Sequence, residues 1–136
     1  MAFLEVNHLK KYFDVAAGTN HAVDDVTFTI EKGHTMAIVG ESGCGKSTRG
    51  RTIIRLLDAT DGQVILDGED ITNAKGRDLR RLREKVSIVF QDPYSSLNPR
   101  FCVDETIREP LEKARRFKRA EIDAKTEELM DLVGIE

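Results

Sequence analysis

The sequence predicts an α/β fold, in which an antiparallel sheet packs against a core of parallel strands and the chain then becomes helical. Three observations support this prediction. Residues 40–48 read GESGCGKST, a glycine-rich loop that lies between an apolar stretch and a helical pattern. The segments 3–6 and 22–30 have the character of strands, and short turns punctuate the first half of the chain. From residue 104 onward the apolar residues are spaced as in helices.

The bulk composition is that of an ordinary soluble globular domain. The chain has 136 residues, of which 40% are hydrophobic and 33% are charged. Lys and Arg number 21 against 24 Asp and Glu, so the formal charge of −3 gives no reason to propose nucleic acid or an anionic membrane as a main partner. No apolar run is long enough to cross a bilayer. A disulfide at Cys44 would distort the glycine loop, so a reduced, cytosolic setting is expected.

The first half of the chain is expected to be rich in strands. In the segment 22–30, Val26, Phe28 and Ile30 fall on one face, as a half-buried strand requires. Residues 14–20 are polar and contain a glycine, which predicts a loop between this strand and the one at 3–6. The apolar stretch 34–39 predicts a buried strand that leads into the glycine loop.

The rest of the chain is expected to alternate helices and strands before it becomes helical. Asp67-Gly68 after an apolar run is a strong hairpin signal. An arginine-rich helix follows, whose leucines Leu79 and Leu82 share a face; its arginines are interpreted as a solvated face, with a nucleic-acid surface as the weaker alternative. The expected elements are a helix at 49–57, a strand at 63–66, a helix at 75–84, a buried strand at 86–90, an irregular segment at 92–100 and helices from 104 to the end.

The glycine loop has the residues that bind a nucleoside triphosphate. Gly40, Gly43 and Gly45 allow the backbone to curl so that successive N–H groups converge on phosphate oxygens. Lys46 would reach the β- and γ-phosphates, and the Ser47 hydroxyl would ligate Mg²⁺. The full set of predicted binding residues in the loop is Gly40, Ser42, Gly43, Cys44, Gly45, Lys46, Ser47 and Thr48.

Two further motifs narrow the family. The loop GESGCGKST resembles that of ABC-transporter ATPases, and VFQDP at 89–93 resembles their Q-loop. The resemblance implies that Gln91 contributes to catalysis and to Mg²⁺ binding. LKKYF at 9–13 resembles the aromatic A-loop that stacks on adenine; its offset from Leu9 favours Phe13, with Tyr12 as the alternative. A plain core role for either ring is the alternative to nucleotide stacking.

A longer match points to one branch of that family. FQDPYSSLNPR at 90–100 and GRTIIRLL at 50–57 resemble the oligopeptide/dipeptide branch of ABC importers, which includes nickel importers, and in particular the F-type subunit. The resemblance implies an ATPase that binds ATP and Mg²⁺ and drives solute uptake. It also implies a second ATPase subunit, as a homo- or heterodimer, and membrane permease subunits that contact the loop after Gln91. Residues 100–112 are then either a surface that contacts the permease or an ordinary subdomain helix. The expected location is cytoplasmic, peripheral on the inner face of the cell membrane.

The resemblance also defines the expected domain organisation. Residues 1–136 correspond to the N-terminal part of one nucleotide-binding domain, with a β-subdomain and P-loop NTPase core at 1–91 and the Q-loop with part of a helical subdomain at 92–136. The 136 residues contain no Leu-Ser-Gly-Gly-Gln signature and no apolar strand that ends in Asp-Glu. The three histidines of the chain all precede the glycine loop, so none of them matches the switch histidine of the family. The fold is therefore expected to be incomplete, and the chain alone is expected to bind nucleotide with negligible turnover.

Two other functional classes were weighed against the importer ATPase. One is a nucleotide-binding or interaction module that does not hydrolyse its ligand, which the missing motifs favour for the chain as given. The other is a soluble P-loop kinase or GTPase, which lacks support because the sequence contains no Asn-Lys-x-Asp guanine motif.

Overall fold

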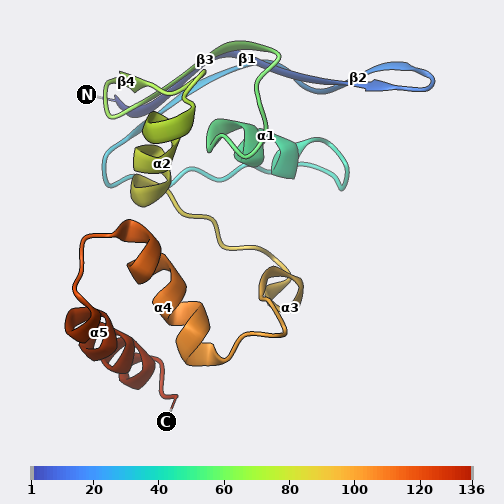
Figure 1. Ribbon diagram of the computed structural model, residues 1–136. Helices are drawn as coiled ribbons and strands as arrows, with labels where there is room; N and C mark the ends of the chain where they lie inside the picture. Colours follow the sequence, from blue (N-terminus) through green and yellow to red (C-terminus); the bar gives the residue numbers. More distant parts are fainter. Residues whose placement is uncertain (1, 136) are drawn as a thin grey trace. The chain divides into compact units, whose positions relative to one another are not determined.

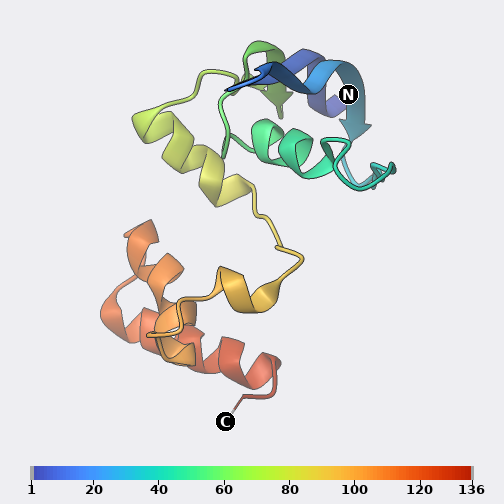
Figure 2. The ribbon, with the colours of Figure 1, turned by 90° about the vertical axis from the view of Figure 1, so that its right-hand side faces the viewer.

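The computed structural model describes residues 2–135, which form two compact units that divide between Ser87 and Ile88 (Figures 1 and 2). The first unit combines a sheet with two helices, and the second is entirely helical. The family-based division at 91–92 stays a prediction, because compactness alone does not define subdomains.

The first unit is organised around a four-stranded antiparallel sheet in the order β2-β1-β3-β4. Strands β1 (Ala2–Val15) and β2 (Gly18–Glu31) form a long hairpin, and β3 (Asp61–Leu66) pairs with the other edge of β1. The short β4 (Glu69–Asp70) closes the sheet. The predicted turn at Asp67-Gly68 is confirmed, since both residues have positive φ, as a two-residue hairpin turn of the primed type requires.

A bulge in β1 explains how its apolar residues share one face. Val6 and Leu9 are three positions apart, so strict alternation would place them on opposite faces. His8 has a φ of 50°, and the pairing with β2 shifts between Val6 and Leu9. The extra residue turns Leu9 back to the core, and both side chains are 0% exposed.

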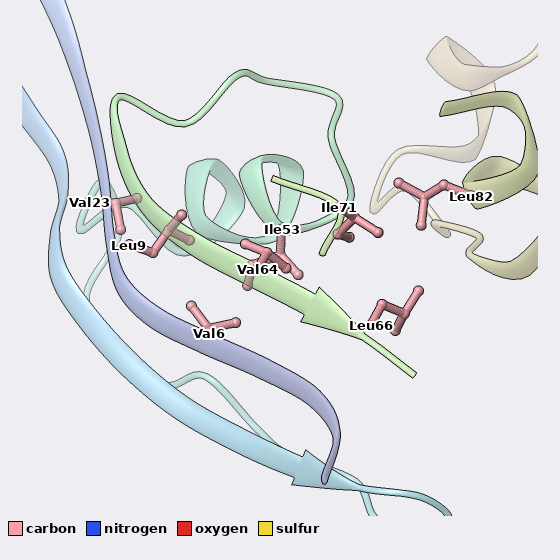
Figure 3. Close-up of a cluster of buried hydrophobic side chains, with 8 residues drawn as sticks. All are labelled: Val6, Leu9, Val23, Ile53, Val64, Leu66, Ile71 and Leu82. Atoms are coloured by element: carbon pink, nitrogen blue, oxygen red, sulfur yellow. The ribbon is translucent and has the colours of Figure 1, made fainter. Parts of the chain in front are cut away.

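Two helices cover one face of the sheet. In both views α1 (Lys46–Ile53) and α2 (Gly76–Lys85) lie on the same side of the strands (Figures 1 and 2). Leu82 is buried and Leu79 packs against the core, so the predicted leucine face of this helix is confirmed. The buried cluster takes side chains from the sheet, from both helices and from the segment after β4: Val6, Leu9, Val23, Ile53, Val64, Leu66, Ile71 and Leu82 (Figure 3). Each such side chain contributes about 1.5–3 kcal/mol by its burial.

The structure corrects three predictions about the first unit and the segment that ends it. The segments 34–39 and 86–90 are not strands, because they pair with no other strand within residues 2–135, and most of their residues are exposed. Val39 is 90% exposed and Val89 is 95% exposed. The predicted loop at 14–20 is also wrong, because the strands run on to Val15 and resume at Gly18. The polar residues of 14–20 lie at the exposed end of the β1–β2 hairpin, where polar side chains do not prevent the two strands from pairing.

The second unit contains α3 (Pro93–Ser96), α4 (Val103–Ala114) and α5 (Arg119–Leu132). The helices predicted after residue 104 are confirmed, and α4 and α5 lie side by side in both views (Figures 1 and 2). The short helix α3 corrects the irregular segment predicted at 92–100; a proline is compatible with a helix when it occupies the first position. At the start of α4, the Glu105 carboxylate accepts a hydrogen bond from the backbone N–H of Cys102. At the start of α5, the Glu121 carboxylate accepts one from the backbone N–H of Lys118.

Candidate functional site

The glycine loop leads directly into α1 through a residue that only glycine suits. Gly45 is the N-cap of this helix and has a φ of 85°, in the left-handed region. A Cβ at this position would lie 2.0 Å from the carbonyl oxygen of Ala22 in β2. The helix can therefore start against the sheet only because residue 45 has no side chain.

The loop closes on itself around a second glycine. A Cβ at Gly40 would lie 2.7 Å from Sγ of Cys44, so the two ends of the loop approach as closely as a missing side chain allows. Gly43 has a φ of 84°, and the N–H of Cys44 donates to the carbonyl oxygen of Glu41 at 3.3 Å. A loop with positive φ values and no side chains at these points directs backbone N–H groups into its concave side.

Lys46 is enclosed by the loop that precedes it. Its Nζ donates to the carbonyl oxygens of Gly40 at 2.7 Å and Glu41 at 2.5 Å, and lies 3.6 Å from Sγ of Cys44. The ammonium group is thus held at the loop by neutral acceptors rather than by a carboxylate. A phosphate that enters the loop would meet this cation without first displacing an ion pair.

The start of α1 adds to the attraction for anions. The first N–H groups of a helix have no partner within it, and the helix dipole places partial positive charge there. Ser47 is exposed in this first turn, while Thr48 is half-buried and its carbonyl oxygen accepts the Thr52 hydroxyl at 2.8 Å. The part of the chain that the structure describes has no group of three or more His, Cys, Asp or Glu that could hold a metal ion.

Tyr12 is held by β2. Its ring stacks on His21 with centroids 4.0 Å apart, and its hydroxyl donates to Oδ1 of Asp24 at 2.5 Å. Its backbone N–H donates to the Thr60 hydroxyl at 2.9 Å. The bond to Asp24 raises the pKa of Tyr12 to about 12, and the Tyr12 hydroxyl in turn lowers the pKa of the Asp24 carboxyl.

Phe13 follows Tyr12 in the strand and so points to the opposite face. It is half-buried, and Nζ of Lys11 lies 4.8 Å from its ring centroid. One face of Tyr12 stacks on His21 and Lys11 lies over the ring of Phe13, so these contacts do not distinguish the two rings. The role of either ring at a nucleotide stays a prediction.

Gln91 is exposed and belongs to the second unit, after the division at Ser87. The predicted contribution of Gln91 to catalysis and to Mg²⁺ binding stays a prediction. Sequence reasoning missed two residues near the aromatic pair, His21 and Asp24. The signal that could have found them is the hairpin register, in which Tyr12 pairs with His21.

Comparison with known proteins places this loop in a family. The family described as ABC transporter matches residues 23–136. The oligopeptide transport ATP-binding protein OppF of Bacillus subtilis is 47% identical over 97% of this chain and 44% of its own length. The oligopeptide transport ATP-binding protein AppF of the same organism is 44% identical over 97% of this chain and 43% of its own length. The chain thus spans less than half the length of these relatives.

Solved structures match the fold. MJ0796, a bacterial ABC transporter cassette with a dimeric structure, matches with a TM-score of 0.81 over 98% of this chain and 58% of its own. Its identity of 24% bears on the fold alone. CbiO1 from Clostridium perfringens matches with a TM-score of 0.73 at 27% identity, over 99% of this chain and 51% of its own. The α/β fold class predicted from the sequence is confirmed. Among residues 2–135, no helix is both long and apolar enough to cross a membrane.

Proposed function

The chain belongs to the ABC transporter family, and on that premise we propose that it is part of an ATP-binding subunit of an importer of the oligopeptide/dipeptide type. The observation that carries the proposal is the glycine loop at the start of α1, where Lys46 is enclosed by carbonyl oxygens rather than by an acidic partner. The peptide branch is supported by relatives named as oligopeptide transport proteins. Nickel or another small solute is the alternative within the same family.

Each predicted residue has a defined task at the nucleotide. The backbone N–H groups of residues 40–48 would orient the phosphates, and Lys46 would offset their charge. The Ser47 hydroxyl and Gln91 would ligate Mg²⁺, and Gln91 would contribute to catalysis. Phe13 would stack on the base. ATP supplies the phosphoanhydride bond whose hydrolysis drives uptake in the whole protein.

The proposed partners follow from the family. We propose that the protein works beside a second ATP-binding subunit, as a homo- or heterodimer, which its membership of the ABC transporter family supports. The loop after Gln91 and residues 100–112 are the proposed contact with membrane permease subunits, which places the protein at the inner face of the cell membrane. The 136 residues lack the carboxylate pair and the signature motif of the family, so we propose that this chain binds MgATP with negligible turnover.

Calorimetric titration with MgATP tests the site directly. We expect saturable binding by the 136-residue chain and loss of affinity by about 10- to 100-fold in Lys46→Ala, since hydrogen bonds to charged groups contribute about 1.5–3 kcal/mol. Lys32→Ala, at an exposed turn outside the loop, is the matched control and should bind as the parent does. If Lys46→Ala bound MgATP as tightly as the parent chain does, the proposed role of Lys46 in the nucleotide site would be wrong. Steady-state hydrolysis that Lys46→Ala abolishes would contradict the expected lack of turnover.

A further inference from the structure

The turn between α4 and α5 concentrates positive charge in a chain that is acidic overall. Residues 113–119 read KARRFKR, with five cations and no acidic residue, whereas the whole chain has a formal charge of −3. Lys113 lies in the last turn of α4, and Arg115 is the C-cap of that helix. Lys118 is the N-cap of α5. The net charge therefore conceals a local basic cluster, which we call the basic turn.

The side chains of the basic turn face solvent, and most lack an acidic partner. Residues 115–119 are all exposed, and Arg115, Lys118 and Arg119 form no ion pair with any described residue. The helix α2 is also rich in arginine, but it contains Asp78 and Glu84, and Arg81 lies 3.4 Å from Asp78 and 3.5 Å from Glu69. The arginines of α2 are thus interspersed with acidic residues of their own helix, whereas residues 113–119 contain none; Lys113 of the basic turn pairs with Glu109 of α4 at 2.5 Å.

An aromatic ring lies at the centre of the cluster. Phe117 is 36% exposed, and Nζ of Lys125 lies 5.6 Å from its ring centroid. Cations that surround an exposed aromatic side chain suit a membrane interface, where phosphate headgroups meet the cations and the ring enters the boundary with the acyl chains. Clusters of four to eight Lys or Arg residues near a bilayer typically bind anionic lipids, with about 1 kcal/mol from each.

We propose that the basic turn, residues 113–119, binds the anionic phospholipid surface of the membrane. The choice of a membrane as the occupant rests on the proposed function, which places the protein beside its permease. The overall charge of −3 repels an anionic surface, so a direct contact between the chain and anionic lipid requires a segregated cluster of cations such as this one. The turn then sets the orientation of the helical unit against the bilayer.

Flotation with vesicles tests the proposal, with phosphatidylcholine alone compared with phosphatidylcholine mixed with phosphatidylglycerol. We expect the 136-residue chain to bind the anionic vesicles only, and the triple variant Arg115→Gln, Lys118→Gln, Arg119→Gln to bind at least about tenfold more weakly. The triple variant Arg77→Gln, Arg80→Gln, Arg83→Gln loses the same charge from exposed positions of α2 and should bind as the parent does. Binding should also weaken as salt rises to about 1 M, where the Debye length falls to about 3 Å.

Each other outcome would overturn the proposal. Absence of vesicle binding, or an equal loss in both triple variants, would mean that the basic turn has no special role. Tight binding of a single-stranded oligonucleotide in place of vesicles would assign the cluster to nucleic acid. Lys46→Ala should still bind anionic vesicles, so a failure of nucleotide binding is distinguishable from a failure of the lipid surface.

Discussion

Gly45 is the residue whose missing side chain most directly shapes the glycine loop. We expect Gly45→Ala to abolish nucleotide binding and to destabilise the first unit, because a φ of 85° is costly for alanine and its Cβ would meet the Ala22 carbonyl oxygen at 2.0 Å. The left-handed conformation alone costs about 1–2 kcal/mol. Urea unfolding and a MgATP titration would measure both effects.

Gly50 offers the matched control within the same helix. A Cβ at Gly50 would meet nothing within 4 Å, and its φ lies outside the left-handed region. Gly50→Ala should therefore leave binding intact and stabilise α1 by up to about 1 kcal/mol, since alanine is the better helix former. If Gly45→Ala behaved like Gly50→Ala, the loop geometry described above would be wrong.

Tyr12 should titrate at unusually high pH. Its pKa is raised to about 12 from the ordinary value of 10.0 because its hydroxyl donates to Asp24. A raised pKa in the folded state stabilises the fold below about pH 10, and this contribution is lost as the pH rises through about 12. In a Tyr94→Phe background, Tyr12 is the one remaining tyrosine, and its phenolate absorbance should appear near pH 12.

Removal of the acceptor separates this effect from general burial. In the double variant Tyr94→Phe, Asp24→Ala, the Tyr12 midpoint should move back toward 10.0 while the circular dichroism at neutral pH is unchanged. A Tyr12 midpoint unchanged by Asp24→Ala would show that the hydrogen bond at 2.5 Å does not control the pKa of this phenol.

At the scale of elements, the bulge in β1 shows why part of the sheet escaped sequence reasoning. The pattern of alternation identified residues 3–6 and then failed, because the bulge at His8 puts Val6 and Leu9 on one face. The hairpin end was missed for a related reason. Its turn at residues 16–17 is Ala-Ala, which lacks the Gly or Asn that usually signals a two-residue turn. The Tyr12–His21 pair depends on that register and could not be found without it.

Elements with strong local signals were predicted well. Asp67-Gly68 specifies its own turn, and the leucines of α2 specify its buried face. The glycine loop was placed before α1 because its residue types and its backbone geometry are tied together. The segments 34–39 and 86–90 failed because an apolar sequence becomes a strand only where another strand pairs with it, which no local pattern reveals.

Pro110 is an internal weakness of α4. A proline inside a helix has no N–H to donate, and its ring disfavours the preceding turn. Pro110→Ala should raise the free energy of unfolding of the helical unit by about 1–3 kcal/mol. Helix content by circular dichroism and urea unfolding would measure it, with Ala114→Gly in the same helix as a control of opposite sign. An unchanged or lower stability for Pro110→Ala would contradict the expectation that this proline weakens α4.

At the scale of the whole molecule, apolar residues outside both cores are unusually exposed. Val39 and Val89 are 90% and 95% exposed in segments that pair with no described strand. Extended apolar segments with unpaired backbone groups are templates for pairing between chains. We therefore expect the chain to associate as its concentration rises, with a mass by light scattering above the 15.3 kDa of one chain.

Charge placed in these segments should suppress the association. The double variant Val39→Lys, Val89→Lys should elute as a monomer of about the chain mass, because a lysine opposes both apolar contact and strand pairing between chains. Val15→Lys, at a hairpin residue that is 51% exposed, introduces the same kind of charge elsewhere and should associate as the parent does. A parent chain that stays monomeric at the highest attainable concentration would show that exposed valines in unpaired segments do not drive association here. Equal suppression by Val15→Lys would assign the effect to net charge, since lysine at any exposed site would then keep the chains apart.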